Sequence, residues 1–482
     1  MSFSVRNVVF SGVLSRLSEA GLRVHLLLRR VPDGENQLVG MGFDAASSRA
    51  AMIVPPAESQ RGRALLNGII GKAFSSRNAI TSYRLYRRWF GRNLRGLDRL
   101  RDHVIEWAGL LARPLPVYQG LCRWTEVLYR RAHDLEAIKR QLRELQPDLI
   151  WSTVCASPLE YPYVLAARDL LIPVVTSVLS FDNLTSRPAL PRYDHYLAWN
   201  SRMQEQLLRL YPTVAPSQVT VTGTPQFDFH RSETSRWSRD LTLHHLGLPS
   251  DARYFLYAAS HESLAPDEPR LVRELVQKLS EDPVLRGHWM VVRLHPLDDG
   301  RRWAQITAPE ALSRIVSAHE RRPDPDGWTI PSVADQAHLV SSIAHCDACI
   351  NIVSTMTLDA AILDRPVIGI EFSAEPASPQ EIMFSEYEAD HYRPVVESGG
   401  LRLARRWPEL MQLLRDAVGD PGRDRRERAE LVRKECGTVD GRSSERVVDA
   451  LLARLQSSQT QRNPRTADAE PYPTAGKESL IA

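Results

Sequence analysis

The sequence predicts an α/β fold of two Rossmann-like domains that face a common cleft, with a helical insertion in the N-terminal domain. Three observations favour this fold class. Short apolar runs alternate with amphipathic helical stretches in both halves of the chain. The runs are continuously apolar, which is typical of strands buried on both faces of a parallel sheet. The 482 residues also suffice for two domains of roughly 200 residues each.

The predicted strands are spread evenly over both halves of the chain. In the first half they lie at residues 24–28, 51–54, 148–152, 173–178, 195–199 and 219–222. In the second half they lie at residues 254–258, 289–294, 348–353 and 367–370. The intervening stretches carry helical periodicity, as in the apolar stripe of Leu271, Leu275 and Leu279. This alternation predicts two doubly wound domains in tandem.

The domain boundaries follow from changes in composition. We expect the first domain at 1–235, with a helical insertion at about 61–143 where strand signals are scarce. The second domain should cover 236–456. The polar tail 457–482, rich in Ser, Thr, Pro and Gln, reads as disordered. The chain begins with a helical pattern at residues 6–20, so the first strand of the first domain is expected to be short or missing.

Bulk composition narrows the class of protein. A formal net charge of +3 is too small to indicate a nucleic-acid partner. Five scattered cysteines do not resemble a disulfide framework, and there is neither a signal peptide nor an apolar run long enough to span a bilayer. These features predict a reduced, cytoplasmic protein. The absence of a G-x-G-x-x-G fingerprint and of a Walker loop argues against an NAD enzyme and a P-loop ATPase.

The strongest local motif lies at residues 349–370 and reads as strand, Ser-Thr turn, helix and strand. Backbone N–H groups at a helix start bind anions, and ligands of open α/β sheets bind at the carboxyl ends of the strands. Ser354 and Thr355 are therefore candidate phosphate contacts. Asp359, one turn into the helix, is a candidate partner for ribose hydroxyls. The alternative is that the hydroxyls simply cap the helix.

Two further predicted strands end in polar residues. The strand at 289–294 leads through Arg293 to His295, and Arg binds phosphate oxygens in a bidentate manner while His donates to a phosphate or protonates a leaving group. The strand at 254–258 leads to Ser260 and His261, which would face the same cleft. The alternative for each is a half-buried polar residue without a ligand.

In the first domain the strand at 173–178 is followed by a polar loop that contains Asp182. An ionised carboxylate within hydrogen-bond reach can deprotonate an acceptor hydroxyl, so Asp182 is the candidate catalytic base. The alternative is a turn in which Asp182 and Asn183 bond to their own backbone.

Residues 83–101 are rich in arginine and contain Trp89 and Phe90. Such a segment can lie on an anionic membrane surface with its aromatic side chains in the interface. A solvated arginine-rich helix face is the alternative.

Five short motifs, at residues 180–186, 221–228, 293–296, 354–359 and 440–446, together resemble a bacterial family. In order and spacing they are similar to GT-B-fold proteins of surface-polysaccharide and teichoic-acid assembly, of the CDP-glycerol glycerophosphotransferase type. UDP-N-acetylglucosamine 2-epimerases share the broader fold. The resemblance covers residues 147–452, most of the predicted folded chain.

The resemblance implies transfer of a sugar or polyol phosphate from a UDP-, CDP- or GDP-linked donor to a carbohydrate or lipid-linked acceptor. It implies that His295, Ser354 and Thr355 hold the donor phosphates in the second domain, with neither a metal ion nor another cofactor. Asp182 and His295 are then the expected catalytic residues. Two alternatives remain open: a nucleotide-sugar 2-epimerase-like isomerase, and a non-catalytic scaffold of polysaccharide assembly.

Overall fold

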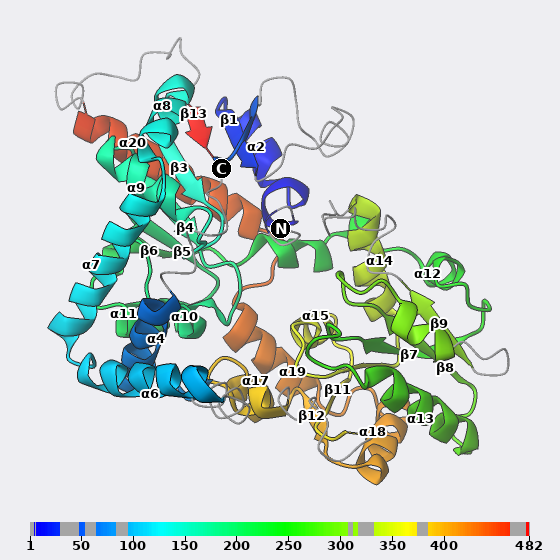
Figure 1. Cartoon of the computed structure of the whole chain (residues 1–482). Coiled ribbons are helices and arrows are strands. Elements are labelled where there is room, and N and C mark those ends of the chain that lie inside the picture. Colours follow the sequence, from blue (N-terminus) through cyan, green and yellow to red (C-terminus); the bar gives the residue numbers. More distant parts are fainter. Residues whose placement is uncertain are drawn as a thin grey trace. The chain divides into compact units, whose positions relative to one another are not determined.

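The computed structural model describes residue 4 and residues 6–28, 48–53, 64–82, 95–306, 312–316, 332–373, 384–462 and 479–481. The chain forms two compact units (Figure 1). We call Phe3–Gln226 together with Arg442–Ala482 the N-terminal unit, and Phe227–Gly441 the C-terminal unit. Each unit contains one parallel sheet with helices packed against it. The predicted fold class, α/β with two Rossmann-like domains as in the GT-B type, is confirmed.

The sheet of the N-terminal unit has seven strands in the order β2-β1-β13-β3-β4-β5-β6, and every neighbouring pair is parallel. The strands are β1 (Arg23–Leu28), β2 (Ser48–Ala51), β3 (Leu149–Ser152), β4 (Val174–Ser177), β5 (His195–Ala198), β6 (Val219–Val221) and β13 (Ser479–Ile481). The central strands β3 and β5 are buried along their whole length, as continuous apolar runs require.

Helices connect and cover these strands. The elements before β1 are a π-helical turn at Arg6–Phe10 and α2 (Val13–Glu19), and later helices are α9 (Tyr161–Asp169), α10 (Asn183–Ser186) and α11 (Ser201–Leu210). The predicted helical insertion is confirmed: it consists of α4 (Ala64–Asn78), α6 (Gly96–Leu111), α7 (Leu115–Ala132) and α8 (Leu135–Leu145). Residues 83–94 of the predicted membrane-facing segment lie outside the described residues.

The described residues of the predicted tail 457–482 belong to a helix and a strand. Helix α20 (Ser443–Arg462) continues past residue 457, and β13 joins the sheet between β1 and β3. Val24 pairs with Leu480, which in turn pairs with Leu149. Strand β13 thus lies in the interior of the sheet and gives β1 and β3 a hydrogen-bonding partner.

The observed boundaries between the two units also differ from the predicted boundary after residue 235. The chain leaves the N-terminal unit after Gln226 and returns at Arg442. The physical reason for the return is α20, whose apolar side chains pack into the core of the N-terminal sheet with α2 and β1. The residues of α20 in this cluster are Val447, Val448, Leu451 and Leu455.

The short motifs at residues 221–228 and 440–446 contact each other where the chain re-enters the N-terminal unit. Gly223 has φ of 79°, and a Cβ there would collide with Ser443 Oγ at the start of α20. Arg446 Nε donates a hydrogen bond to Thr222 O at 2.8 Å. Only glycine permits this close approach of the loop after β6 to the helix. The close docking gives a physical reason for glycine in one motif and arginine in the other.

The sheet of the C-terminal unit has six parallel strands in the order β12-β11-β10-β7-β8-β9. They are β7 (Arg253–Ala258), β8 (His288–Arg293), β9 (Ser313–Val316), β10 (Ala348–Asn351), β11 (Val367–Ile370) and β12 (Arg402–Ala404). The helices include α12 (Arg239–His245), α13 (Glu268–Glu281), α14 (Val333–Ala344), α15 (Met356–Ile362), α17 (Arg393–Glu397), α18 (Trp407–Gly419) and α19 (Arg425–Leu431).

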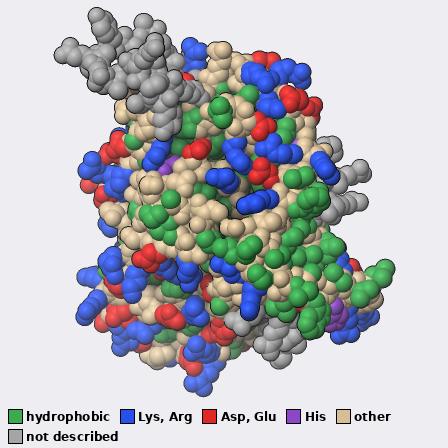
Figure 2. Space-filling model, turned by 90° about the vertical axis from the view of Figure 1, so that its left-hand side faces the viewer, with side chains coloured by type: hydrophobic (Ala, Val, Ile, Leu, Met, Phe, Trp, Pro, Cys, Tyr) green, Lys and Arg blue, Asp and Glu red, His purple; other side chains and the backbone are tan. Residues whose placement is uncertain are grey.

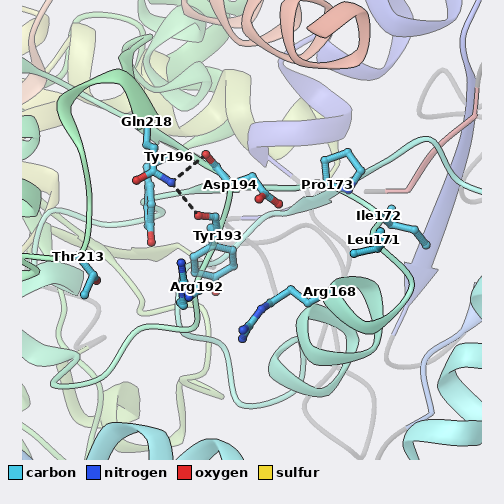
Figure 3. A pocket seen from close by; sticks show the side chains of 10 residues that line it. All are labelled: Arg168, Leu171, Ile172, Pro173, Arg192, Tyr193, Asp194, Tyr196, Thr213 and Gln218. Atoms are coloured by element: carbon cyan, nitrogen blue, oxygen red, sulfur yellow. Dashed lines mark hydrogen bonds between the residues drawn. The ribbon is translucent and has the colours of Figure 1, made fainter. Parts of the chain in front are cut away.

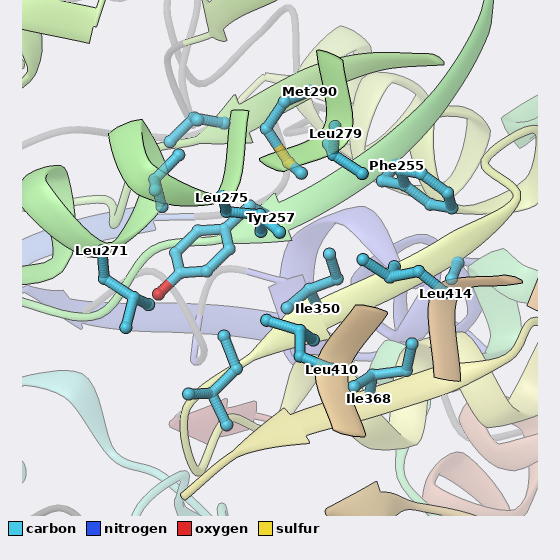
Figure 4. Close-up of a cluster of buried hydrophobic side chains, with 14 of the residues drawn as sticks. Phe255, Tyr257, Leu271, Leu275, Leu279, Met290, Ile350, Ile368, Leu410 and Leu414 are labelled. Carbon is cyan, nitrogen blue, oxygen red and sulfur yellow. The ribbon is translucent and has the colours of Figure 1, made fainter. Parts of the chain in front are cut away.

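The core of the C-terminal unit lies between the sheet and helices α13 and α18 (Figure 4). The predicted stripe of Leu271, Leu275 and Leu279 is buried there against Phe255 and Met290. This packing fixes β7, β8 and β10 beside one another. Their carboxyl ends therefore lie along one edge of the sheet.

Candidate functional site at the carboxyl edge of the C-terminal sheet

The residues predicted to bind the donor follow three adjacent strands of the C-terminal unit, at one edge of its sheet. Strand β7 lies between β10 and β8. Ser260 and His261 follow β7, the middle strand of the three. His295 follows β8 and the Ser354-Thr355 pair follows β10. The structure thus brings His261 and His295 together, with Ser354 and Thr355 on the neighbouring strand end.

The two histidines meet edge to face, with ring centroids 5.3 Å apart. In each ring Nδ1 accepts a backbone N–H two residues further on, from Ser263 to His261 and from Leu297 to His295, both at 3.2 Å. A neutral imidazole whose Nδ1 accepts carries its proton on Nε2. Both half-buried rings therefore have an Nε2–H donor at this edge of the sheet.

The turn after β10 is built by side chain to backbone hydrogen bonds. Buried Asn351 accepts from the Ser354 backbone N–H through Oδ1, and Ser354 Oγ accepts from Met356 N, each at 3.2 Å. Val353 adopts a left-handed φ of 43° to enter the turn. Ser354 thus does cap the helix, as the alternative interpretation held. Thr355 is exposed, and its side chain makes no capping bond.

Two predicted ligand contacts are instead buried and already paired. Arg293 is 6% exposed, and its Nη1 lies 2.5 Å from Nδ1 of His338 on α14. Burial and the Arg293 charge lower the pKa of His338 to about 3, so that ring stays neutral beside the guanidinium. Ser260 is also buried, and its backbone N–H donates to Glu268. A direct phosphate contact by Arg293 or Ser260 does not fit this geometry.

Asp359 is likewise turned inward. It is 6% exposed, and its Oδ1 lies 2.9 Å from Nε2 of His230, itself 3% exposed. The predicted hydrogen bond from Asp359 to ribose hydroxyls is corrected accordingly, because the carboxylate faces a buried histidine. Asp359 belongs to the run Thr357–Ile362 of α15, and all residues of this run are buried.

In the N-terminal unit, Asp182 lies beyond the carboxyl end of β4, at the start of α10. It is half-buried, and Asn183 Nδ2 approaches its Oδ1 only at 3.5 Å. The turn is held by other bonds, from Ser180 N to Asn183 Oδ1 and from Thr185 Oγ1 to Asp182 O. The Asp182 carboxylate is therefore not needed to shape the loop.

Sequence reasoning missed a second carboxylate at this edge, Glu160. It follows β3 and precedes α9, and Ser152 Oγ donates to its Oε2 at 2.6 Å. Burial raises the pKa of Glu160 to about 7, against the hydrogen bond from Ser152. A carboxyl poised to exchange protons near neutral pH is a recognised feature of reactive sites. No spacing rule in the sequence marks it, because the perturbation comes from burial.

The N-terminal unit also has a pocket of about 480 Å³ at the opposite, amino-terminal edge of β4, β5 and β6 (Figure 3). Its polar groups mostly bond to the protein itself: Arg168 pairs with Glu126, Asp194 accepts from Val174 N, and Gln218 donates to two backbone carbonyls. The lining residues are Arg168, Leu171, Ile172, Pro173, Arg192, Tyr193, Asp194, Tyr196, Thr213 and Gln218. The pocket contains none of the predicted site residues.

Among the described residues, no group of three or more His, Cys, Asp and Glu side chains is placed to hold a metal ion. Within the same residues, no helix combines the length and the apolar character that crossing a bilayer requires. Cys346 and Cys349 are both fully buried and unbridged, as a packing role for the pair requires.

Residues 185–453, more than half of the chain, match the sequence profile of the family "CDP-Glycerol:Poly(glycerophosphate) glycerophosphotransferase". The chain belongs to this family. The match includes His261, His295 and the Ser354-Thr355 turn, and it begins three residues after Asp182. Its members are named for transfer of glycerophosphate from CDP-glycerol to a polymer, which fits the resemblance seen in the five short motifs.

Solved structures give more distant likenesses. The wall teichoic acid polymerase TagF is 12% identical, with a TM-score of 0.40, and the match covers 71% of this chain and 99% of that one. A UDP-N-acetylglucosamine 2-epimerase from Listeria monocytogenes, described as putative, is 14% identical with a TM-score of 0.44, over 70% and 81% of the two chains. The Neisseria meningitidis enzyme bound to UDP-GlcNAc is 12% identical with a TM-score of 0.42, over 69% and 82%. No curated protein matches the chain.

Proposed function

We propose that this member of the glycerophosphotransferase family transfers a sugar or a polyol phosphate from a nucleotide-activated donor to a carbohydrate or lipid-linked acceptor during surface-polymer biosynthesis. The observation that supports the proposal most is the pair His261 and His295, which presents two Nε2–H donors at the carboxyl edge of a parallel sheet. That edge is where open α/β sheets bind nucleotides.

The donor phosphates would accept hydrogen bonds from these two Nε2–H groups and from the exposed hydroxyl of Thr355. When the bond to the leaving phosphate breaks, negative charge grows on its oxygens, and donors that are already in place stabilise that charge. His295 would supply a proton to the leaving group. We propose that this chemistry needs no metal ion.

The acceptor hydroxyl would lose its proton to Asp182, whose carboxylate accepts only a long hydrogen bond of 3.5 Å from Asn183 within the described part of the chain. Glu160, at the same edge of the N-terminal sheet, is a second candidate base because burial raises its pKa to about 7.

Incubation of the full chain with CDP-glycerol and with UDP-, CDP- and GDP-sugars, with and without acceptor glycans, tests this function. Proton NMR of the mixture should show nucleotide released only when an acceptor is present. Conversion of a UDP-sugar into its 2-epimer without acceptor would instead support an isomerase. If no donor is consumed under any condition, the proposed activity is wrong and the scaffold alternative gains support.

We further propose that the protein works in the cytoplasm as a peripheral protein of an anionic membrane surface. Helix α6 has an exposed apolar stripe at positions three and four residues apart, of which Leu97 and Trp107 are 83% and 69% exposed. The stripe consists of Leu97, Leu100, Val104, Trp107 and Leu111. In Figure 2 hydrophobic side chains gather on the side of the molecule that carries the helical insertion, with Lys and Arg side chains nearby.

Exposed Arg95, Arg99 and Arg101 lie at the start of the same helix, with Asp98 as the exposed acidic residue among them. Each basic residue near an anionic bilayer contributes about 1 kcal/mol of attraction. An apolar face with flanking arginines is the pattern of a helix that lies in the membrane interface.

Flotation with vesicles of phosphatidylglycerol tests this contact. Leu100→Ser/Trp107→Ser should lower the fraction of protein that floats. Leu171→Ser should not, although this leucine of the same unit outside α6 is even more exposed, at 83%. Equal flotation of the wild-type protein with phosphatidylcholine vesicles would argue against the role of the arginines.

A further inference from the structure

We propose that buried Glu268 and half-buried Arg302 and Asp298 form a positioning device that holds the His261 loop and the His295 loop in register for ligand binding. The inference rests on the proposed function for the role of the two histidines. The three residues are positioning residues. They act by fixing the backbone of the loops that carry the rings.

Arg302 is the centre of this cluster. Its Nη1 donates to Ala265 O at 2.7 Å and its Nη2 donates to Ser260 O at 2.6 Å, so one guanidinium holds both ends of the loop around His261. Its Nε donates to Asp298 Oδ2 at 2.7 Å, in the turn that follows His295. A planar guanidinium with several fixed donors is suited to such a crosslink, whereas a lysine ammonium cannot reproduce it.

Glu268 completes the His261 side. It is fully buried at the start of α13, and both of its oxygens accept from the Ser260 backbone N–H, at 2.9 Å and 3.1 Å. Tyr257 donates its hydroxyl proton to Glu268 Oε1 at 3.0 Å, and Arg302 Nη2 lies 3.3 Å from Oε2. The residue directly before His261 is therefore fixed by a buried acid.

Asp298 completes the His295 side. Its backbone N–H donates to His295 O at 2.9 Å, its Oδ1 accepts from Gly300 N, and its Oδ2 accepts from the indole N–H of buried Trp303 at 3.0 Å. Burial alone would raise the pKa of Asp298, but these hydrogen bonds and Arg302 hold it below its ordinary value. The carboxylate therefore stays charged opposite the guanidinium.

The position of the three side chains indicates that they align the two histidine loops rather than stabilise the C-terminal unit as a whole. Burial of charged groups carries a desolvation penalty of several kcal/mol per ion, and well-packed apolar side chains often stabilise a core as well or better. The donors and acceptors that these three side chains satisfy belong mainly to the two histidine loops, which leave adjacent strands β7 and β8. Their combined effect is to set where one ring lies relative to the other.

Histidine NMR of the ligand-free full chain tests the device, because the Cε1–Hε1 resonances report the surroundings of each ring. Arg302→Lys should shift the resonances of both His261 and His295. Glu268→Gln should shift His261 more than His295, and Asp298→Asn should shift His295 more than His261. The resonances are assigned by single His→Asn variants.

Arg415→Lys is the matched control. Arg415 forms an ion pair with Asp282, at 2.5 Å, in the same unit, and neither residue bonds to a histidine loop. This variant should leave both resonances in place. Glu268→Gln and Asp298→Asn are nearly isosteric replacements. Their effects on the two histidine resonances therefore test the proposal even if Arg302→Lys does not fold.

The proposal is overturned if the histidine resonances stay unchanged in folded variants, or if Glu268→Gln and Asp298→Asn shift both rings equally. A parallel titration with CDP separates this result from the proposed function. Absence of any CDP-induced shift would count against nucleotide binding while leaving the ligand-free pattern, and with it the positioning device, intact.

Discussion

The imidazole rings of His261 and His295 meet edge to face with their centroids 5.3 Å apart, although the residues belong to different loops. The loops follow neighbouring parallel strands, so the sheet places the rings beside each other. Each ring accepts a backbone N–H at Nδ1, so its proton lies on Nε2.

Replacement of His295 should reduce catalysis with little change in folding. We expect His295→Asn to lower kcat by about 10²–10⁴-fold, the usual contribution of a general acid or base. Initial rates of nucleotide release from the active donor measure it. His244→Asn, at an exposed histidine on α12, is the control and should keep wild-type rates. Full activity in His295→Asn would exclude the assigned role.

Replacement of the acceptor base should separate chemistry from donor binding. We expect Asp182→Asn to lower kcat by about 10²–10⁴-fold while the KM for the donor stays close to that of the wild type. Glu160→Gln identifies which carboxylate acts: the variant with the greater loss marks the base. Glu205→Gln, at an exposed acid of the same unit, should behave as wild type. Unchanged rates in both test variants would refute an acidic base at this edge.

Stability should depend on pH through Glu268. Burial raises its pKa from the ordinary 4.5 to about 7, against hydrogen bonds and the charge of Arg302. The folded protein thus keeps a proton that the unfolded chain releases. Its contribution to stability is full below about pH 4.5 and is lost as the pH rises to about 7, by up to about 3 kcal/mol.

Urea unfolding over this pH range measures the effect, and Glu268→Gln should flatten the decline because glutamine does not titrate. The control Glu262→Gln, at an exposed acid of the same loop, should keep the wild-type slope. If wild type and Glu268→Gln show the same slope, Glu268 is not the titrating group.

A buried arginine of α19 should matter far more for stability than an exposed one nearby. Arg428 is 2% exposed, and its Nε and Nη2 donate to Asp364 Oδ1 at 2.9 Å and 2.7 Å. We expect Arg428→Ala to lower the free energy of unfolding by about 2 kcal/mol or more, since it removes buried hydrogen bonds to a charged group. Arg433→Ala removes an exposed ion pair with Glu430 and should leave stability unchanged.

The strands could be predicted where they are continuous apolar runs. Residues 195–199 and 367–370, for example, became β5 (His195–Ala198) and β11 (Val367–Ile370). The missed strands β9 and β12 are short edge strands with exposed residues, so they lack that signal. Strand β13 has only three residues, and its partners β1 and β3 are hundreds of positions away, so no local pattern marks it.

The sequence predicts which residues lie near the carboxyl ends of the strands. It does not predict the direction in which their side chains point. Arg293 is still the last residue of β8, so its side chain leaves a face of the sheet and meets α14. His295 lies two residues beyond the strand and reaches the edge. Glu160 and Glu268 were missed because burial, which the sequence does not display, sets their pKa values.

The most direct test of the central claim is thermal unfolding of the wild-type protein and of His261→Ala/His295→Ala with saturating CDP, UDP and GDP species. A nucleotide that binds only the folded state stabilises it by about 2.7 kcal/mol at one hundred times its Kd. We predict that at least one of these nucleotides raises the Tm of the wild-type protein and that the double variant loses this rise. No rise with any nucleotide, or an equal rise in both proteins, would contradict a donor site at His261 and His295.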